Sequence, residues 1–347
     1  MAQPNLLLAG FAKCGTTSLA KYLSAHPAIL TSAAKEIYYL IDSDSPLASM
    51  RGAIDGMRET KAREPGAAKR YADYFPDDDS KRYVLDATPM YYSQARALGY
   101  ARDHRDVKIV FMIRNPVERV VSSYRFVCGM FHDYPEISLS GFVDALLDVG
   151  NTREAYRSRI RKDFFRYLFD CELDMGRYHV HLRKWVAAAG NGRVFVGTME
   201  ELASAPKLLM RRLCRFLDLD ATNYETFEFT PYLQSYGVRL PFLQRLGRRL
   251  AGEDLMRYDR MDRHHSQFHR IANERIRKFL DHIYNKLQIR PLHDADTPTL
   301  KRLHDFYLPH NLRLRDDFGI DYVRAGATPP SLQRAPGMQP KLSSLRS

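Results

Sequence analysis

Residues 6–20, which read Leu-Leu-Leu-Ala-Gly-Phe-Ala-Lys-Cys-Gly-Thr-Thr-Ser-Leu-Ala, decide the fold class of this chain. An apolar run leads into Gly10, four residues separate it from Gly15, and an amphipathic helical pattern follows. A strand, a glycine turn and a helix in this order direct backbone N–H groups and a helix N-terminus at an anion. The stretch therefore predicts a phosphate-binding loop.

The loop differs from a nucleoside-triphosphate P-loop in the place of its lysine. Such a loop continues with Gly-Lys-Ser or Gly-Lys-Thr. Here Thr16 stands at the lysine position, Thr17 keeps the hydroxyl, and Lys13 lies inside the turn. We expect a loop that still holds a phosphate but does not support magnesium–triphosphate chemistry.

A second segment narrows the class of enzyme. Residues 107–113 form a buried-strand pattern that ends at Arg114, and Ser122 follows on a helix that a proline starts. A kinase or ATPase places an aspartate after such a strand to hold magnesium. An arginine with a hydroxyl instead grips phosphate without a metal.

The order and spacing of these motifs resemble the sulfotransferases that use 3′-phosphoadenosine 5′-phosphosulfate (PAPS), and the style is closest to the heparan-sulfate and carbohydrate branch. Residues 13–18 resemble the 5′-phosphosulfate loop, and the pair Arg114 and Ser122 resembles the 3′-phosphate motif. The resemblance covers roughly residues 5–323. Further matching segments are Ser24–Pro27, Lys35–Tyr39, Asp86–Tyr91, Gly176–Trp185 and Asn311–Gly319.

The resemblance implies a donor site on the loop and on the segment after residues 107–113. Lys13 would contact the oxygen that bridges phosphate and sulfate, where a cation stabilises the leaving charge. Other readings stay open, because the loop hydroxyls also suit helix capping and Arg114 also suits a salt bridge to Glu118 or Asp103. The donor-binding residues that the resemblance implies are Lys13, Cys14, Gly15, Thr16, Thr17, Ser18, Arg114, Ser122 and Arg239.

The resemblance assigns Glu36 the role of general base. A positioned carboxylate can take the proton of an acceptor hydroxyl in the transition state. A solvated Glu36 beside Lys35 is the alternative. His26 is a second candidate base, although its place before Pro27, where a helix ends, favours a structural hydrogen bond. Asp86 is a candidate for orienting Lys13 or the acceptor.

Alternation of strand and helix patterns predicts an α/β protein with a P-loop-like three-layer fold, in which helices flank a central parallel sheet. The expected strands lie at 6–9, 83–86, 108–113 and 194–197, and the expected later helices at 117–130, 138–149, 151–186 and 204–217. The expected organisation is a sulfotransferase domain at 1–324 with an insertion or lid at 43–80, an adenosine 3′-phosphate loop and basic helix at 232–252, and a disordered tail at 325–347.

We therefore expect in-line transfer of the sulfuryl group from PAPS to an acceptor hydroxyl, without a metal, leaving adenosine 3′,5′-bisphosphate. The aromatic residues around Glu36 resemble the carbohydrate branch, so a carbohydrate or glycolipid is the expected acceptor. A lipid or small-molecule alcohol stays open as the acceptor. A P-loop nucleotide-dependent kinase-like enzyme and a non-catalytic glycan-binding module stay open as other classes.

Composition fits this expectation. The chain has 53 Lys and Arg against 41 Asp and Glu, a formal net charge of +12, which suits a donor with several phosphates. No nucleic-acid-binding signature is present, and His264, His265 and His269 lack the carboxylate or cysteine partners of a metal site. With no signal peptide or apolar span in the sequence, we expect a cytoplasmic enzyme of bacterial type. The basic pattern at 245–249 leaves peripheral membrane contact open.

Overall fold

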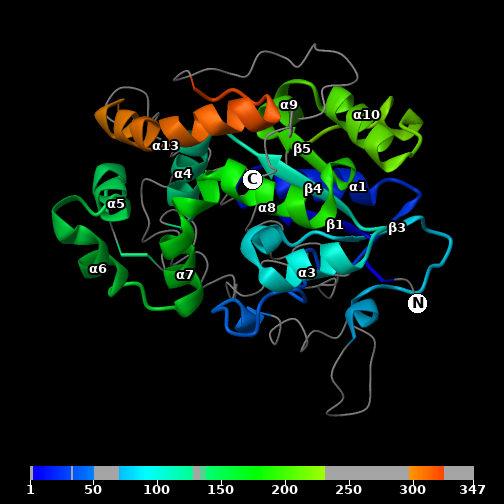
Figure 1. Cartoon of the computed structure of the whole chain (residues 1–347), viewed down its shortest axis with the longest axis horizontal. Coiled ribbons are helices and arrows are strands. Elements are labelled where there is room, and N and C mark those ends of the chain that lie inside the picture. The colour runs from blue at the N-terminus through cyan, green and yellow to red at the C-terminus, as the bar shows by residue number, and fades with distance from the viewer. Residues whose placement is uncertain are drawn as a thin grey trace, which may run out of the picture. The chain divides into compact units, whose positions relative to one another are not determined.

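The computed structural model describes residues 3–32, 34–50, 70–127, 134–135, 137–230 and 297–323 (Figure 1). The chain forms two compact units. The first comprises residues 1–120, 170–233 and 302–347, and the second comprises residues 121–169 and 234–301. The expected bounds of the domain, the insertion and the tail stay predictions.

The first unit is built on a five-stranded parallel sheet with the strand order β2-β3-β1-β4-β5. Parallel sheets are buried on both faces, which is why their strands read as continuous apolar runs. All five residues of β1 are buried, as are five of the six in β4. The strands are β1 (Leu6–Gly10), β2 (Ile29–Thr31), β3 (Tyr83–Asp86), β4 (Lys108–Ile113) and β5 (Val194–Thr198). The α/β class and the four expected strands are confirmed, and β2 adds a fifth.

Helices cover both faces of this sheet. The connection from β1 through α1 (Thr16–Ser24) runs toward β2, whereas those through α3 (Ala95–Asp103) and α8 (Tyr178–Ala189) run the other way. Right-handed crossovers in opposite directions place their helices on opposite faces. Accordingly α3 and α8 pack against each other (Figure 1). The expected three-layer arrangement is confirmed.

Helix α8 belongs to the first unit, and one of its faces is buried. Tyr178, Leu182 and Trp185 recur at helical spacing and are all buried, and Trp185 Nε1 donates to the Tyr92 carbonyl at 2.9 Å. Arg183 pairs with Asp317 on α13 (Thr297–Phe318) through two bonds of 2.7 and 2.6 Å.

Short 3₁₀ turns connect several of these elements. They are Tyr71–Tyr74, Pro89–Ser93, Val149–Asn151, Asp174–Gly176, Asn191–Arg193 and Thr222–Tyr224.

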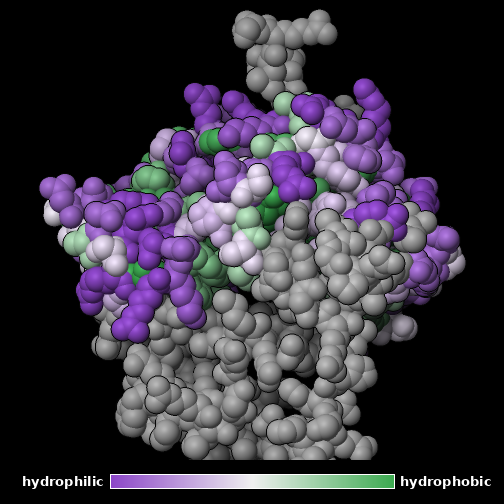
Figure 2. Space-filling model, turned by 90° about the horizontal axis from the view of Figure 1, so that it is seen from below, coloured by the Kyte–Doolittle hydropathy of each residue, from purple (hydrophilic) through white to green (hydrophobic). Residues whose placement is uncertain are grey.

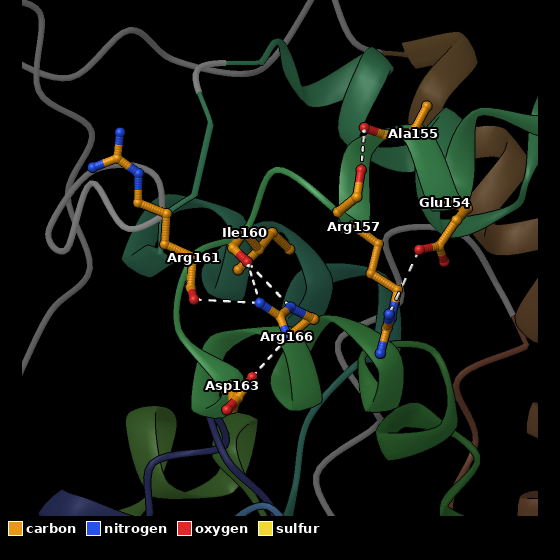
Figure 3. Close-up of polar contacts among 8 residues, drawn as sticks. Glu154, Ala155, Arg157, Ile160, Arg161, Asp163 and Arg166 are labelled. Atoms are coloured by element: carbon orange, nitrogen blue, oxygen red, sulfur yellow. Dashed lines mark hydrogen bonds and ion pairs between the residues drawn. The ribbon is translucent and has the colours of Figure 1, made fainter.

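The single helix expected at 151–186 is wrong, because the chain forms α6 (Thr152–Arg157), α7 (Asp163–Cys171) and α8 there. Figure 3 shows the cause at the first break. The Arg166 guanidinium donates to the Ile160 carbonyl at 3.1 and 3.0 Å and to the Arg161 carbonyl at 3.3 Å. A side chain thus satisfies carbonyl groups that a continuous helix would pair with its own backbone.

Two other helix boundaries differ from the expected ones. The helix expected at 204–217 is α10 (Pro206–Leu217), which begins after Ala205 because the residue before a proline disfavours helical geometry, and a separate short helix, α9 (Met199–Ser204), precedes it. Helix α4 comprises Pro116–Phe126, and the end expected for it at 130 lies outside the described residues. Helix α5 (Leu139–Leu146) is shorter than expected. In the second unit, rings of α5, α6 and α7 form an aromatic core, with the Tyr156 and Phe169 centroids 5.4 Å apart.

The described surface is mostly hydrophilic, with hydrophobic residues in small separate spots on the face that Figure 2 shows. Val149 and Leu208 are the large hydrophobic residues exposed in the part of the chain that the structure describes. Among these same residues, none of the helices combines the length and the apolar character needed to cross a bilayer.

Candidate active site

The loop between β1 and α1 turns through two left-handed residues, Lys13 with φ 67° and Gly15 with φ 81°. Gly15 caps α1, and a Cβ atom there would lie 2.4 Å from Met199 Sδ. Glycine is therefore required both by the backbone conformation and by the close approach of α9. It also caps the helix without a side chain that would compete with an anion at the helix N-terminus.

Arg114 and Lys35 each lie within electrostatic reach of Lys13, the lysine of the loop. Burial and the neighbouring Arg114 charge, with a smaller effect of Lys35, lower the pKa of Lys13 from 10.5 to about 7. Arg114 follows β4, the strand beside β1, and the connections after these two strands leave in opposite directions. In open α/β sheets, ligands bind at such switch points. Lys13 and Arg114 at this edge make it a candidate anion site.

Arg114 has the ion pair that the sequence left open as an alternative role. Its Nη2 atom lies 3.4 Å from Glu118 Oε2, and the two side chains are 27% and 54% exposed. A pair this open to solvent is worth about 0–1 kcal/mol, so Glu118 is a weak competitor for an incoming phosphate.

The other residues of the loop differ in how deeply their side chains are buried. Cys14 is fully buried with its Sγ 3.7 Å from the Tyr178 hydroxyl, and burial raises the pKa of the thiol to about 12. This thiol is inert, so the predicted donor contact of Cys14 rests on its backbone. Thr16 and Ser18 are buried and Thr17 is half-buried in the first turn of α1.

Glu36 is held on both carboxylate oxygens. Lys35 Nζ lies 2.6 Å from Oε1, and the Tyr38 hydroxyl donates to Oε2 at 2.6 Å. The Glu36 side chain remains 26% exposed. The expected contact with Lys35 is present, and so is the fixed orientation that a base needs.

His26 has the structural role that its position before Pro27 favoured. Its Nδ1 accepts from the Ala28 N–H at 3.1 Å, so Nε2 carries the proton and donates to the Asp220 carbonyl at 2.9 Å. Both ring nitrogens are used in fixing the chain after α1.

A buried ion pair beneath the loop was not predicted from the sequence. Arg119 and Glu172 are 0% and 2% exposed, their Nη1 and Oε1 atoms lie 3.0 Å apart, and Arg119 Nη2 also donates to the Glu172 carbonyl. Burial favours a lower pKa for Arg119, but the Glu172 carboxylate raises it above its usual value. Glu172 also acts on Lys13, whose pKa it raises. Nothing in the sequence distinguishes Glu172 from its acidic neighbours.

Some predicted site residues belong to the second unit or lie outside the described part of the chain, and their roles stay predictions. Ser122 is buried on α4, in the second unit, whereas Lys13 and Arg114 belong to the first. Arg239, the basic segment at 245–249 and the three histidines near 265 lie outside the described residues. Within the residues that are described, no three His, Cys, Asp or Glu side chains group as metal ligands.

The fold and the loop define a class: α/β proteins with helices on both faces of a parallel sheet and a glycine turn between the first strand and the first helix. The sequence of residues 3–282 matches the family described as the sulfotransferase domain. Because this match covers most of the sequence, the chain belongs to the sulfotransferase family.

The two relatives described here are distant, and their names refer to carbohydrates. The chain is 22% identical over 229 residues to the bifunctional heparan sulfate N-deacetylase/N-sulfotransferase 1 of Caenorhabditis elegans, covering 65% of this chain and 23% of that protein. It is 21% identical over 253 residues to carbohydrate sulfotransferase 15 of Mus musculus, covering 62% and 44%. The chain thus spans less than half the length of these curated relatives.

A solved structure of a sulfotransferase from Alicyclobacillus acidocaldarius has the same fold. Its TM-score against this chain is 0.50 at 22% sequence identity, and the superposition covers 81% of this chain and 97% of that one.

Proposed function

We propose that this chain transfers the sulfuryl group of PAPS to a hydroxyl of a carbohydrate or glycolipid. The observation that carries the proposal is the placement of Lys13 and Arg114 after the neighbouring parallel strands β1 and β4, with Lys35 within electrostatic reach of Lys13. A site with so much positive charge gains most from a ligand with several phosphates, and the loop backbone suits one of them.

The chemistry follows from the placement of the charged groups. Glu36 takes the proton of the acceptor hydroxyl as its oxygen attacks the sulfur atom. The bond from sulfur to the bridging oxygen breaks, and the electron pair stays on the phosphate of adenosine 3′,5′-bisphosphate. Lys13 stabilises that leaving charge, and its pKa near 7 lets it act as a cation once a phosphate is bound. In this scheme the protein cations supply the charge stabilisation.

The acceptor proposal rests on the relatives and on the base segment. The names of the similar proteins refer to heparan sulfate and carbohydrates. Glu36 is followed by two tyrosines, Tyr38 and Tyr39, and amphipathic aromatic rings beside a carboxylate suit a sugar. A lipid or small-molecule alcohol is the alternative acceptor.

Calorimetric titration with adenosine 3′,5′-bisphosphate, with and without magnesium, tests the donor site. We expect binding that does not depend on magnesium and that weakens about tenfold or more in Lys13→Ala and in Arg114→Ala, since each removes a charge-assisted contact. Arg102→Ala is the control, because Arg102 is an exposed arginine on α3 that pairs with Asp103. Binding of ATP with magnesium in place of the bisphosphate contradicts the proposal.

Radiolabelled PAPS then tests the acceptor class with three probes: desulfated heparan sulfate, glucosylceramide and p-nitrophenol. Label in the first or second supports a carbohydrate or glycolipid acceptor. Label in p-nitrophenol alone contradicts it and favours a small-molecule acceptor.

A further inference from the structure

Asp86, at the carboxyl end of β3, is fully buried and accepts three hydroxyl hydrogen bonds. The Thr88 hydroxyl donates to Oδ1 at 2.6 Å, and the Tyr71 and Tyr91 hydroxyls each donate to Oδ2 at 2.7 Å. A buried carboxylate with this many donors is a satisfied charge, so the cluster has one defined set of hydrogen positions.

Two of these hydroxyls also hold the backbone that follows Glu36. The Ile37 N–H donates to Thr88 Oγ1 at 3.2 Å, and the Leu40 N–H donates to the Tyr91 hydroxyl at 3.1 Å. A hydroxyl has a single hydrogen, which both groups give to Asp86, so their oxygens are left to accept from the two amides. The carboxylate therefore sets the direction of both contacts.

The segment between the two held amides fixes Glu36. Tyr38 lies there in a left-handed conformation with φ 53°, which costs free energy for a residue with a side chain. Its hydroxyl donates to Glu36 Oε2, and the next ring, Tyr39, stacks on Tyr71 with centroids 4.4 Å apart. If the Ile37 and Leu40 amides were released, Tyr38 could relax and Glu36 would lose its fixed orientation.

We propose that Asp86 is a positioning residue for Glu36, acting through the Thr88 and Tyr91 hydroxyls on the backbone of residues 37–40. This inference rests on the proposed function, in which Glu36 is the base. Burial raises the pKa of Asp86 to about 6 although its three hydrogen bonds favour ionisation, so Asp86 is a carboxylate at neutral pH. Its charge keeps the hydroxyl hydrogens on its own side.

Tyr91→Phe and Tyr71→Phe form a matched pair of tests. Each removes one hydroxyl that donates to the same Asp86 oxygen at the same distance, but only the Tyr91 hydroxyl also accepts from the Leu40 amide. We expect Tyr91→Phe to lower kcat on the order of tenfold, and Tyr71→Phe to keep kcat within about twofold. Affinity for adenosine 3′,5′-bisphosphate should stay unchanged in both, since the donor loop is not altered.

Hydrogen exchange at residues 37–42 gives a readout that needs no acceptor. Exchange should quicken in Tyr91→Phe and, independently, in Thr88→Val, but not in Tyr71→Phe, because only the first two variants release an amide of this segment. Equal exchange in the three variants would overturn the inference.

A double variant separates failure of this inference from failure of the proposed function. Turnover is followed as label transferred from PAPS to whichever of the three probes is modified. If Glu36→Gln keeps full turnover, Glu36 is not the base and the proposed function fails at that point. If Glu36→Gln is impaired, Tyr91→Phe should add nothing in that background, because both act through Glu36. Full additivity of the two losses would overturn the positioning role alone.

Discussion

The two halves of the candidate site are held in opposite ways. On the donor side, Lys13 and Arg114 stand directly at the ends of neighbouring strands, so their positions follow from the sheet itself. On the base side, Glu36 lies in a segment without regular structure, and the hydroxyl groups of Thr88 and Tyr91, from the 3₁₀ turn Pro89–Ser93 and the residue that caps it, hold the backbone after it. The donor half is fixed by backbone geometry, and the base half by a buried charge. Perturbations should therefore separate binding from turnover.

Glu36→Gln should have the largest effect on turnover. Removing a general base costs about 10²–10⁴ in rate, whereas the donor loop and its cations are unchanged. We expect kcat to fall by that factor with the affinity for adenosine 3′,5′-bisphosphate unaltered, measured by transfer of label and by calorimetry. Weakened binding would show that the two halves are not independent.

Arg119→Met tests the buried support of the donor half. Removing one partner of a buried ion pair leaves the other charge without compensation and costs about 3–5 kcal/mol of the free energy of unfolding. The double variant Arg119→Met with Glu172→Leu should recover most of that loss, because no buried charge remains. Denaturant unfolding measures the stability of both variants. A double variant as unstable as the single one would mean that the packing of the two side chains, and not the pairing of their charges, provides the stability.

Proton uptake on binding measures how far Lys13 is protonated before a phosphate binds. With a pKa near 7, free Lys13 is mostly neutral at pH 8, and a bound phosphate raises that pKa, so the complex should take up a proton. Affinity should accordingly fall as pH rises above 7, while below about pH 6 Lys13 is charged before binding and uptake disappears. Calorimetry at pH 8 in buffers of different ionisation enthalpy measures the uptake.

Lys13→Arg is the matched control for this measurement, since arginine stays charged throughout the range. It should bind with little proton uptake. Equal uptake in Lys13→Arg and in the unaltered protein would assign the titrating group elsewhere.

Glu118→Ala should have the smallest effect. It removes the weak, exposed partner of Arg114, so affinity for adenosine 3′,5′-bisphosphate should rise by no more than about fivefold. A loss of affinity on calorimetry would show instead that Glu118 orients Arg114 for the phosphate.

The loop and the strands on which Lys13 and Arg114 are placed could be predicted because their information is local. The apolar run at 6–9, the glycine turn and the strand before Arg114 each occupy a few consecutive residues, and parallel strands bring their carboxyl ends to one edge. His26 was also readable, since Pro27 marked the end of a helix. These features need only periodicity and turn chemistry.

The base half and the buried pair could not be predicted in the same way. Tyr71 and Asp86 are separated by 15 residues, and Arg119 and Glu172 by 53, so no local pattern records that they meet. The break at Ile160 likewise depends on a side chain, Arg166, whose partner carbonyls are known only once the chain has folded. At that break a side-chain contact between residues six positions apart overrides the helical periodicity.

The buried thiol of Cys14 can report how often the loop between β1 and α1 opens. A thiol with no exposed surface and a pKa near 12 is shielded from alkylating reagents in the folded chain. Modification of Cys14 must therefore wait for a local opening, and its rate relative to a free thiol measures how often the loop opens. Peptide mapping after iodoacetamide treatment reads that frequency directly, and a donor that closes the site should slow it.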